Sequence, residues 1–239
     1  MTGTEMYFNE LEKIFSQVTS TQAEAIERAA QACSEALKNG KLIYTFGTGH
    51  SHILAEEIFF RAGGLAAVYP VFDDPLMLTH ASRSSYMERL SGYAVLLLDE
   101  ARPIPGSVMF IFSNSGRNSV SVEMAEEAHK RGLTVICITN MKHTRHTSSR
   151  HPSGRKLYEL CDIVIDNCGC IGDASVEIYG RRSGATSTVI GAAILQAITC
   201  RTVELCGGQA EVFCSANLDE GKQINEQYIN KYKSLIKPL

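Results

Sequence analysis

The chain has 239 residues, 44% of them hydrophobic, and carries a formal net charge of −3 at pH 7. Its length and composition allow one domain with a sizeable buried core. The slight negative charge argues against a nucleic-acid partner held by phosphate neutralisation. The sequence also shows neither a signal-peptide segment at its start nor an apolar run of membrane length. We therefore expect a cytoplasmic protein that binds neither nucleic acid nor membranes.

The first predicted elements are two helices that together cover about 4–38. The first carries an apolar stripe that runs from Leu11 to Val18 at helical spacing. Thr21 and Glu24 form a capping-box pattern that predicts the start of the second helix. Gly40 follows that helix, in the position where glycine often ends one.

Strands and helices then alternate along the chain. The predicted strands cover 41–46, 66–72, 108–112, 134–139 and 162–166. The predicted helices cover 51–62, 84–101, a segment that ends at Arg131, 186–205 and the terminal segment 219–236, although 94–98 would also suit a strand. Such alternation is typical of a parallel sheet covered by helices on both faces. The predicted fold class is therefore α/β, a three-layer sandwich with a central parallel sheet.

The segment SNSGRNS (113–119), which we name the serine turn, lies between a predicted strand and a predicted helix. Free N–H groups and the positive dipole end at a helix start favour a phosphate. Serine hydroxyls donate to phosphate oxygens, and Gly116 permits a left-handed turn close to a ligand. Ordinary capping explains the same residues. No lysine follows the glycine, so a triphosphate loop is disfavoured.

The segment FGTGHS (46–51), which we name the glycine turn, follows the first predicted strand. It lacks the third glycine of a dinucleotide fingerprint. Ligands of open parallel sheets bind beyond the carboxyl ends of the strands, where both turns lie. The two turns together predict a site for a small phosphorylated ligand. Its candidate residues are Gly49, His50, Ser51, Ser113, Asn114, Ser115 and Asn118.

Glu57 falls on the inner face of the predicted helix 51–62, one turn before Arg61. It forms either a structural ion pair with Arg61 or a base beside the ligand. Glu56 is the alternative base if the helical register differs. His80, in a polar loop at the carboxyl edge, is the favoured acid–base histidine, and His50 and His52 are further candidates.

Two other segments carry polar groups of uncertain role. Asp173 and Glu177 either bind ligand hydroxyls, act as bases or belong to a capped turn. The segment 142–156, which we name the basic loop, is rich in Lys, Arg and His. It is either a solvated loop or a lip that steers an anionic ligand.

The eight cysteines do not form a metal-binding pattern. Cys168 and Cys170 are the one close pair, and their spacing is not that of a zinc knuckle. Cys33, Cys137 and Cys200 lie in apolar segments, where free cysteine packs as a small hydrophobe. We expect free thiols and neither a metal nor another cofactor.

The paired turns FGTGHS and FSNSGRNS resemble those of the sugar isomerase (SIS) domain. Longer stretches resemble bacterial SIS proteins labelled phosphoheptose isomerases, namely GTGHSHILAEEIFFRAGGL, HPSGRKLYELCDIVIDN and FCSANLDEGKQIN. Asn118 stands where the family turn usually has Thr, and its amide can still donate to a phosphate.

The resemblance implies a single SIS domain over 1–239, with helices at about 4–38 and 219–236 added to the fold. It implies a phosphorylated sugar as ligand and aldose–ketose isomerisation as activity, with Glu57, His80 or Glu56 moving protons. A non-catalytic sugar-phosphate sensor and an amino-sugar phosphate etherase remain alternatives. SIS proteins generally assemble with ligand sites near subunit boundaries. We therefore expect at least a homodimer, with the apolar helix 186–205 buried on more than one side.

Overall fold

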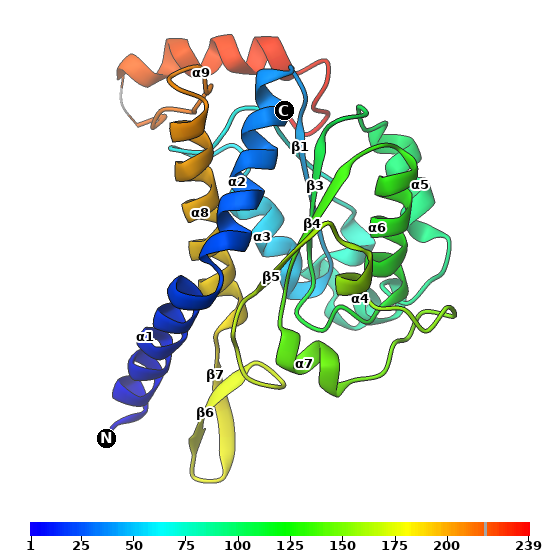
Figure 1. The fold of residues 1–239 in the computed structure, drawn as a ribbon, viewed down its shortest axis with the longest axis vertical. Coiled ribbons are helices and arrows are strands. Elements are labelled where there is room, and N and C mark those ends of the chain that lie inside the picture. Colours follow the sequence, from blue (N-terminus) through cyan, green and yellow to red (C-terminus); the bar gives the residue numbers. More distant parts are fainter. Residues whose placement is uncertain (218) are drawn as a thin grey trace.

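Figure 1 shows the computed structural model, which describes residues 1–217 and 219–239; the side chains of residues 80, 219 and 220 lie outside the description. Its central sheet has five parallel strands in the order β2–β1–β3–β4–β5. The strands are β1 (Ile43–Gly47), β2 (Val68–Pro70), β3 (Val108–Phe112), β4 (Thr134–Thr139) and β5 (Ile163–Asp166). The predicted α/β class is confirmed, and all five predicted strands are present.

Helices cover both faces of this sheet (Figure 1). They are α1 (Gly3–Thr21), α2 (Ala23–Lys38), α3 (His52–Glu57), α4 (Ala81–Met87), α5 (Tyr93–Ala101), α6 (Ser119–Lys130), α7 (Met141–His146), α8 (Ser187–Leu205) and α9 (Asp219–Tyr232). Side chains alternate along each strand, so every strand feeds two cores. Ile43 and Phe110 pack with α1, α2, α3 and α8, whereas Tyr44 and Met109 pack with α5 and α6 on the other face.

The strand order places the two predicted turns next to each other. β1 pairs with β3 in parallel, and Gly47 lies opposite Phe112 at the ends of the two strands. After β1 the chain enters α3 on one face, and after β3 it enters α6 on the other. The strand order therefore reverses between β1 and β3. A crevice at the carboxyl ends of such neighbouring strands is the usual ligand position in open α/β sheets.

The predicted helix 51–62 is shorter than expected. A 3-10 helix (Gly49–Ser51) leads into α3, which ends at Glu57. Beyond it, backbone N–H groups of Gly63 and Ala66 donate to a distant segment, at 2.8 Å from the carbonyl oxygens of Phe213 and Glu211. This non-local pairing draws the chain away from helical geometry.

The predicted helix 84–101 is wrong as one element. It is divided into α4 and α5 at Gly92, whose φ is +83°. The carboxylate of Glu123 accepts the Gly92 N–H at 2.7 Å and so replaces the helical hydrogen bond there. The predicted Thr21–Glu24 capping box is also wrong, because Thr21 is the last residue of α1 and Gln22 is the N-cap of α2.

Two elements were not predicted. The helix α7 follows β4, and an antiparallel hairpin of β6 (Ala174–Ile178) and β7 (Arg181–Ala185) projects beside α1 (Figure 1). The Tyr7 hydroxyl of α1 donates to the carbonyl oxygen of Ala185 at 2.7 Å and joins the two elements. All eight cysteines are free thiols, but Cys200 is exposed rather than packed.

The long helix α8 has the length and apolar composition of a membrane-crossing helix, contrary to expectation. Core helices often share this length and composition. Ile190, Ile194 and Ile198 of α8 are buried in the core that α2 and α3 share. In this structure α8 is a core helix with part of its surface uncovered.

The backbone of the glycine turn comes back so close to Gly47 that we expect no side chain to fit at this position. A Cβ added there would lie 2.6 Å from the carbonyl carbon of Ser51. We expect Gly47→Ala to lower the free energy of unfolding by about 3 kcal/mol, because backbone atoms must shift. Gly40→Ala is the control, with φ +66° and no atom within 4 Å of the added Cβ. It should cost roughly 1 kcal/mol of backbone strain. Urea unfolding compares them, and equal losses would contradict the steric account.

Candidate functional site

A cleft of about 510 Å³ opens at the carboxyl edge of the sheet, between the two predicted turns. It contains every residue predicted to bind phosphate. Its walls are Thr48, Gly49, His50, Ser51, Glu88, Ser113, Asn114, Ser115, Arg117, Asn118, His143, Thr147, Arg150, Gly172 and Asp173. The structure thus brings together side chains from the glycine turn, the serine turn and the basic loop.

The serine turn is held by hydrogen bonds at its base. The Ser113 hydroxyl accepts the Gly116 N–H at 3.1 Å, and the Thr139 hydroxyl donates to the Ser113 carbonyl oxygen at 2.7 Å. Gly116 has φ +57°, and an added Cβ would lie 3.2 Å from the Thr144 hydroxyl oxygen. The predicted left-handed glycine is therefore confirmed. The turn is a fixed frame rather than a loose loop.

The N-terminus of α6 is not capped by its own N-cap side chain. Asn118 is the N-cap residue, yet its side-chain oxygen accepts the Arg150 guanidinium at 3.0 Å. The Val120 N–H donates to the Glu88 carbonyl oxygen at 3.1 Å. Within the described part of the chain, the Ser119 N–H has no acceptor. The helix end therefore keeps a free N–H and its positive dipole end beside the cleft.

The glycine turn presents its polar groups to the same cleft. The Ser51 N–H donates to the Thr48 carbonyl oxygen at 3.1 Å, and the Thr48 hydroxyl donates to a Glu88 carboxylate oxygen at 2.9 Å. His50 is exposed and lines the cleft, whereas His52 is buried and lies near Glu56, with 3.4 Å between Nε2 and Oε1.

The side chain of Asn114 already makes a hydrogen bond with another side chain. Its Oδ1 atom accepts the Asn167 side-chain amide at 2.9 Å. It also borders a small adjoining cavity with Ser51, Ser113 and Ser187. Asn114 therefore links the serine turn to the end of β5 as well as lining the cleft.

The two glutamates that were predicted as bases, Glu57 and Glu56, lie outside the cleft. Glu57 pairs with Arg61, and its Oε1 atom accepts the Gln196 side-chain amide at 3.2 Å. Glu56 is 46% exposed and faces His52. Neither glutamate lines the cleft of the single chain. The side chain of His80 falls outside the described residues, so its role stays a prediction.

Two carboxylates line the cleft, Asp173, which the sequence analysis named, and Glu88, which it did not. Asp173 accepts the N–H groups of Thr186 and Ser187 at 3.1 and 2.9 Å, and the Ser187 hydroxyl at 2.7 Å. It therefore caps α8, as the capped-turn alternative predicted. Glu177 is exposed on the hairpin. Among the described residues, Glu88 is the carboxylate of the cleft that accepts no hydrogen bond from the N–H groups of a helix start.

The basic loop contributes His143, Thr147 and Arg150 to the cleft, which fits the lip alternative. The Gly172 N–H donates to His143 Nδ1 at 2.9 Å. Burial, followed by the charges of Arg117 and His146, lowers the pKa of His143. The ring is therefore held neutral with its proton on Nε2, where it is a hydrogen-bond donor.

Arginines gather at the mouth of the cleft. Burial, followed by the charges of Arg117 and Arg89, lowers the pKa of Arg150. The Arg117 side chain reaches the Ser148 hydroxyl at 3.4 Å, while its buried Nε has no partner among the described residues. Like charges this close are stabilised when an anion binds between them.

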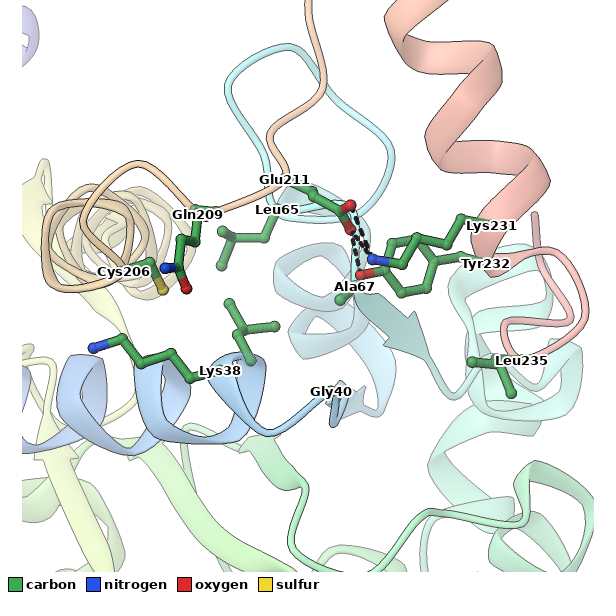
Figure 2. Close-up of a pocket in the computed structure, with 12 residues that line it drawn as sticks. Lys38, Gly40, Leu65, Ala67, Cys206, Gln209, Glu211, Lys231, Tyr232 and Leu235 are labelled. Carbon is green, nitrogen blue, oxygen red and sulfur yellow. Dashed lines mark hydrogen bonds and ion pairs between the residues drawn. The ribbon is translucent and has the colours of Figure 1, made fainter.

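A separate pocket of about 220 Å³ lies at the opposite edge of the sheet (Figure 2). It borders Gly40 and Ala67, which precede β1 and β2. Glu211 accepts Lys231 Nζ at 2.8 Å and the Tyr232 hydroxyl at 2.6 Å there, and burial raises the pKa of Tyr232 to about 12. No predicted site residue lines this pocket. Among the described residues, no group of three or more His, Cys, Asp or Glu side chains is placed to hold a metal.

Comparison with known proteins agrees with this architecture. The family model described as SIS domain matches residues 6–140. A UPF0309 protein of Shouchella clausii is 39% identical over 99% of both chains. A UPF0309 protein of Halalkalibacterium halodurans is 43% identical over 95% of both chains.

Two solved structures share the fold at low sequence identity. A phosphoheptose isomerase from Francisella tularensis has a TM-score of 0.56 and 16% identity, covering 87% of this chain and 100% of that chain. The Vibrio vulnificus NanR protein, complexed with ManNAc-6P, has a TM-score of 0.52 and 17% identity, covering 98% of this chain and 71% of that chain. The family match and the close relatives show that the chain belongs to the SIS domain family.

Proposed function

We propose that the protein binds a phosphorylated sugar in the cleft, with the phosphate at the N-terminus of α6. The observation that carries this proposal is the uncapped helix end at Asn118, in a cleft that Ser51, Ser113 and Ser115 also line. Neutral donors and a helix dipole suit a phosphate. NanR, which shares the fold, is complexed with a sugar phosphate, and this supports the same ligand class.

The proposed reaction is aldose–ketose isomerisation. A carboxylate takes the proton from C2 of an open-chain aldose phosphate, and the carbonyl oxygen at C1 gains a proton to form the enediol. The O2 hydroxyl then loses its proton as the C2 carbonyl forms, and the base returns a proton to C1. Glu88 lies in the cleft and is our candidate base. His143, which lines the same cleft, is our candidate proton donor to substrate oxygens.

The roles of the bases predicted from the sequence, Glu57, His80 and Glu56, stay proposals. Glu57 contacts Gln196 on α8, next to the part of that helix that the chain leaves uncovered. It would therefore reach a ligand only in a neighbouring subunit's cleft. His80 and Glu56 stay predictions. A non-catalytic sensor is the alternative function, because NanR shares the fold and carries a bound sugar phosphate; an etherase would use the same kind of carboxylate.

We also propose a homodimer or larger homo-oligomer. One side of α8 carries Val189, Ala193, Ala197 and Cys200 at helical spacing, and Val189 is 42% exposed. Phe60, which follows α3, is 52% exposed. Uncovered apolar surface of this kind is typical of an interface between chains.

Removal of the serine donors tests the phosphate site. We expect Ser113→Ala/Ser115→Ala to weaken sugar-phosphate binding, because each lost donor costs about 1–3 kcal/mol. Calorimetric titration of the parent and the variant with a panel of sugar phosphates measures the change. Ser91→Ala, an exposed serine outside the cleft, is the matched control. Equal affinity in the double variant and the parent would contradict the proposal.

The carboxylate assignment is tested by Glu88→Gln and Glu57→Gln, each of which keeps the side-chain size. We expect Glu88→Gln to lower turnover on the order of a hundredfold while ligand affinity is largely kept. Product formation from the panel is followed by NMR, which also separates isomerisation from ether cleavage or from binding alone. Full activity of Glu88→Gln would refute its role, and a loss confined to Glu57→Gln would place the base at a subunit boundary.

Light scattering at micromolar concentration tests the assembly. The expected mass is at least twice 26.2 kDa. Ala197→Glu, which puts a charge on the uncovered side of α8, should shift the protein toward monomer because the charge would be buried. A parent protein that is strictly monomeric would overturn the proposed dimer.

A further inference from the structure

Apart from the Arg117 guanidinium, the serine turn offers a phosphate neutral donors and a helix dipole. A phosphate monoester carries about −1.5 to −2 charges near neutral pH, and its burial is favoured by a cation close to it. The turn has no lysine after its glycine. The structure therefore raises the question of which cation completes the site.

Two cations of the basic loop already have partners outside the cleft. Arg155 lies 3.9 Å from the Glu126 carboxylate, and Lys156 donates to the Thr144 carbonyl oxygen. Arg150 differs from these two because it lines the cleft, and within the described chain its guanidinium has no carboxylate within salt-bridge distance. It contacts the N-cap residue of α6 instead, donating to Asn118 Oδ1 at 3.0 Å.

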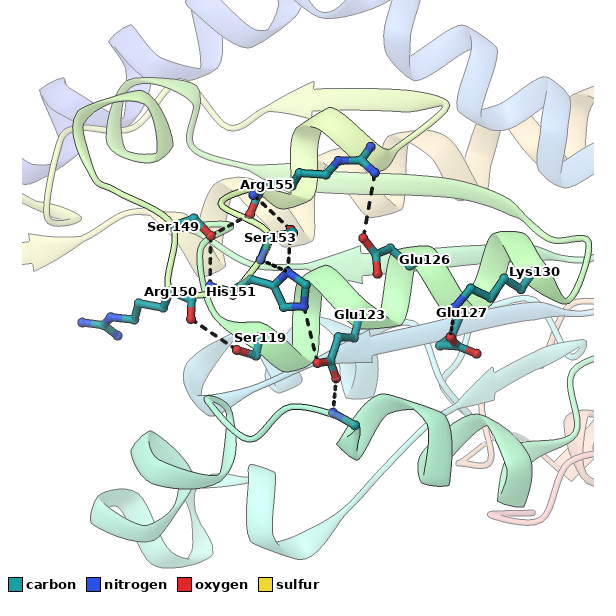
Figure 3. A network of polar contacts seen from close by, with 11 residues as sticks. Ser119, Glu123, Glu126, Glu127, Lys130, Ser149, Arg150, His151, Ser153 and Arg155 are labelled. Carbon is teal, nitrogen blue, oxygen red and sulfur yellow. Dashed lines mark hydrogen bonds and ion pairs between the residues drawn. The ribbon is translucent and has the colours of Figure 1, made fainter.

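The backbone of Arg150 is attached directly to the serine turn. Its N–H donates to the Arg117 carbonyl oxygen at 2.8 Å, and its carbonyl oxygen accepts the Ser119 hydroxyl at 3.4 Å. Figure 3 shows the Arg150 side chain extending away from the polar network that its neighbours form. Because these bonds use main-chain atoms, they persist when the side chain is changed.

A nearly buried pair anchors the adjacent residue. His151 Nε2 lies 3.5 Å from Glu123 Oε1, and both side chains are 11% exposed (Figure 3). The His151 Nδ1 atom lies 2.7 Å from the Ser153 hydroxyl. The second Glu123 oxygen accepts the N–H of Gly92. The loop is therefore fixed to α6 and to the start of α5 one residue after Arg150.

We propose that Arg150 is the cationic clamp of the phosphate site and selects ligands that carry a phosphate monoester dianion. The proposal rests on the proposed function. Arg150 reaches the cleft from a loop far along the chain and bonds to the one side chain that would otherwise cap α6. It thereby frees the helix end for the ligand and adds a second positive charge to that of Arg117 in the cleft. The neighbouring Arg117 raises the local positive potential.

The test is calorimetric titration of the full chain with fructose 6-phosphate, inorganic phosphate and fructose. We expect Arg150→Ala to weaken phosphate-ligand binding roughly tenfold or more, because a charge-assisted contact is lost. Arg150→Lys keeps the charge without the planar fork and should recover part of the affinity. Arg155→Ala, on the same loop but outside the cleft, is the matched control and should bind like the parent.

The pH dependence separates a clamp from a structural role. The second phosphate pKa is about 6, so parent affinity should rise between about pH 5 and 7 as the dianion forms. Arg150→Ala should flatten this rise, whereas a merely structural loss would lower affinity equally at both pH values. Circular dichroism confirms that each variant is folded.

The outcomes distinguish this inference from the proposed function. If the parent binds the phosphate ligands and Arg150→Ala binds them as Arg155→Ala does, the clamp is refuted and the phosphate site stands. The same holds if the pH profile of Arg150→Ala is unchanged. If the parent binds neither phosphate ligand, both proposals fail.

Discussion

The parallel pairing of β1 with β3 is the constraint on which the site depends. It brings the ends of the two strands together at Gly47 and Phe112, so the turns that follow must share one edge of the sheet. Because α3 and α6 then leave toward opposite faces, no helix fills the space between the turns. The cleft is thus a consequence of strand order, and the turn residues decide what it can hold.

The N-termini of α8 and α6 differ in whether a side chain caps them, and this difference explains the electrostatics of the cleft. At α8, Asp173 occupies the N-terminus and neutralises its dipole. At α6, Asn118 is turned toward Arg150, and the helix end stays open. The first helix end is completed by the protein, whereas the second is left for an anion. Such an asymmetry within one cleft fits a ligand with a single phosphate at a defined position.

Local patterns could be predicted from the sequence. The strand 108–112 depends on its own apolar residues, and the left-handed Gly116 depends on the residues of the serine turn. The predicted end of α3 failed because Gly63 pairs with Phe213, which is distant in the sequence. Helical periodicity cannot detect such pairing. The prediction that Glu57 lies on an inner helix face assumed a helix to residue 62, whereas α3 ends at Glu57.

Site residues that the sequence analysis did not predict were missed for the same reason. Thr48 meets Glu88 across 40 residues, and Asn118 meets Arg150 across 32. Neither contact leaves a periodic signal, although the charge of the basic loop indicated an anion-facing role. The sugar in the proposed ligand comes from the family and its relatives, because the physical pattern alone specifies a phosphate.

The central claim is that a sugar phosphate binds with its phosphate at the N-terminus of α6. The most direct measurement is the backbone amide NMR shift of Ser115 and Ser119 during titration with a sugar phosphate and with the same sugar lacking phosphate. Our account predicts large, saturable shifts at both amides with the phosphorylated sugar and far smaller ones with the neutral sugar. Unchanged Ser115 and Ser119 amides in the presence of a bound sugar phosphate would contradict it.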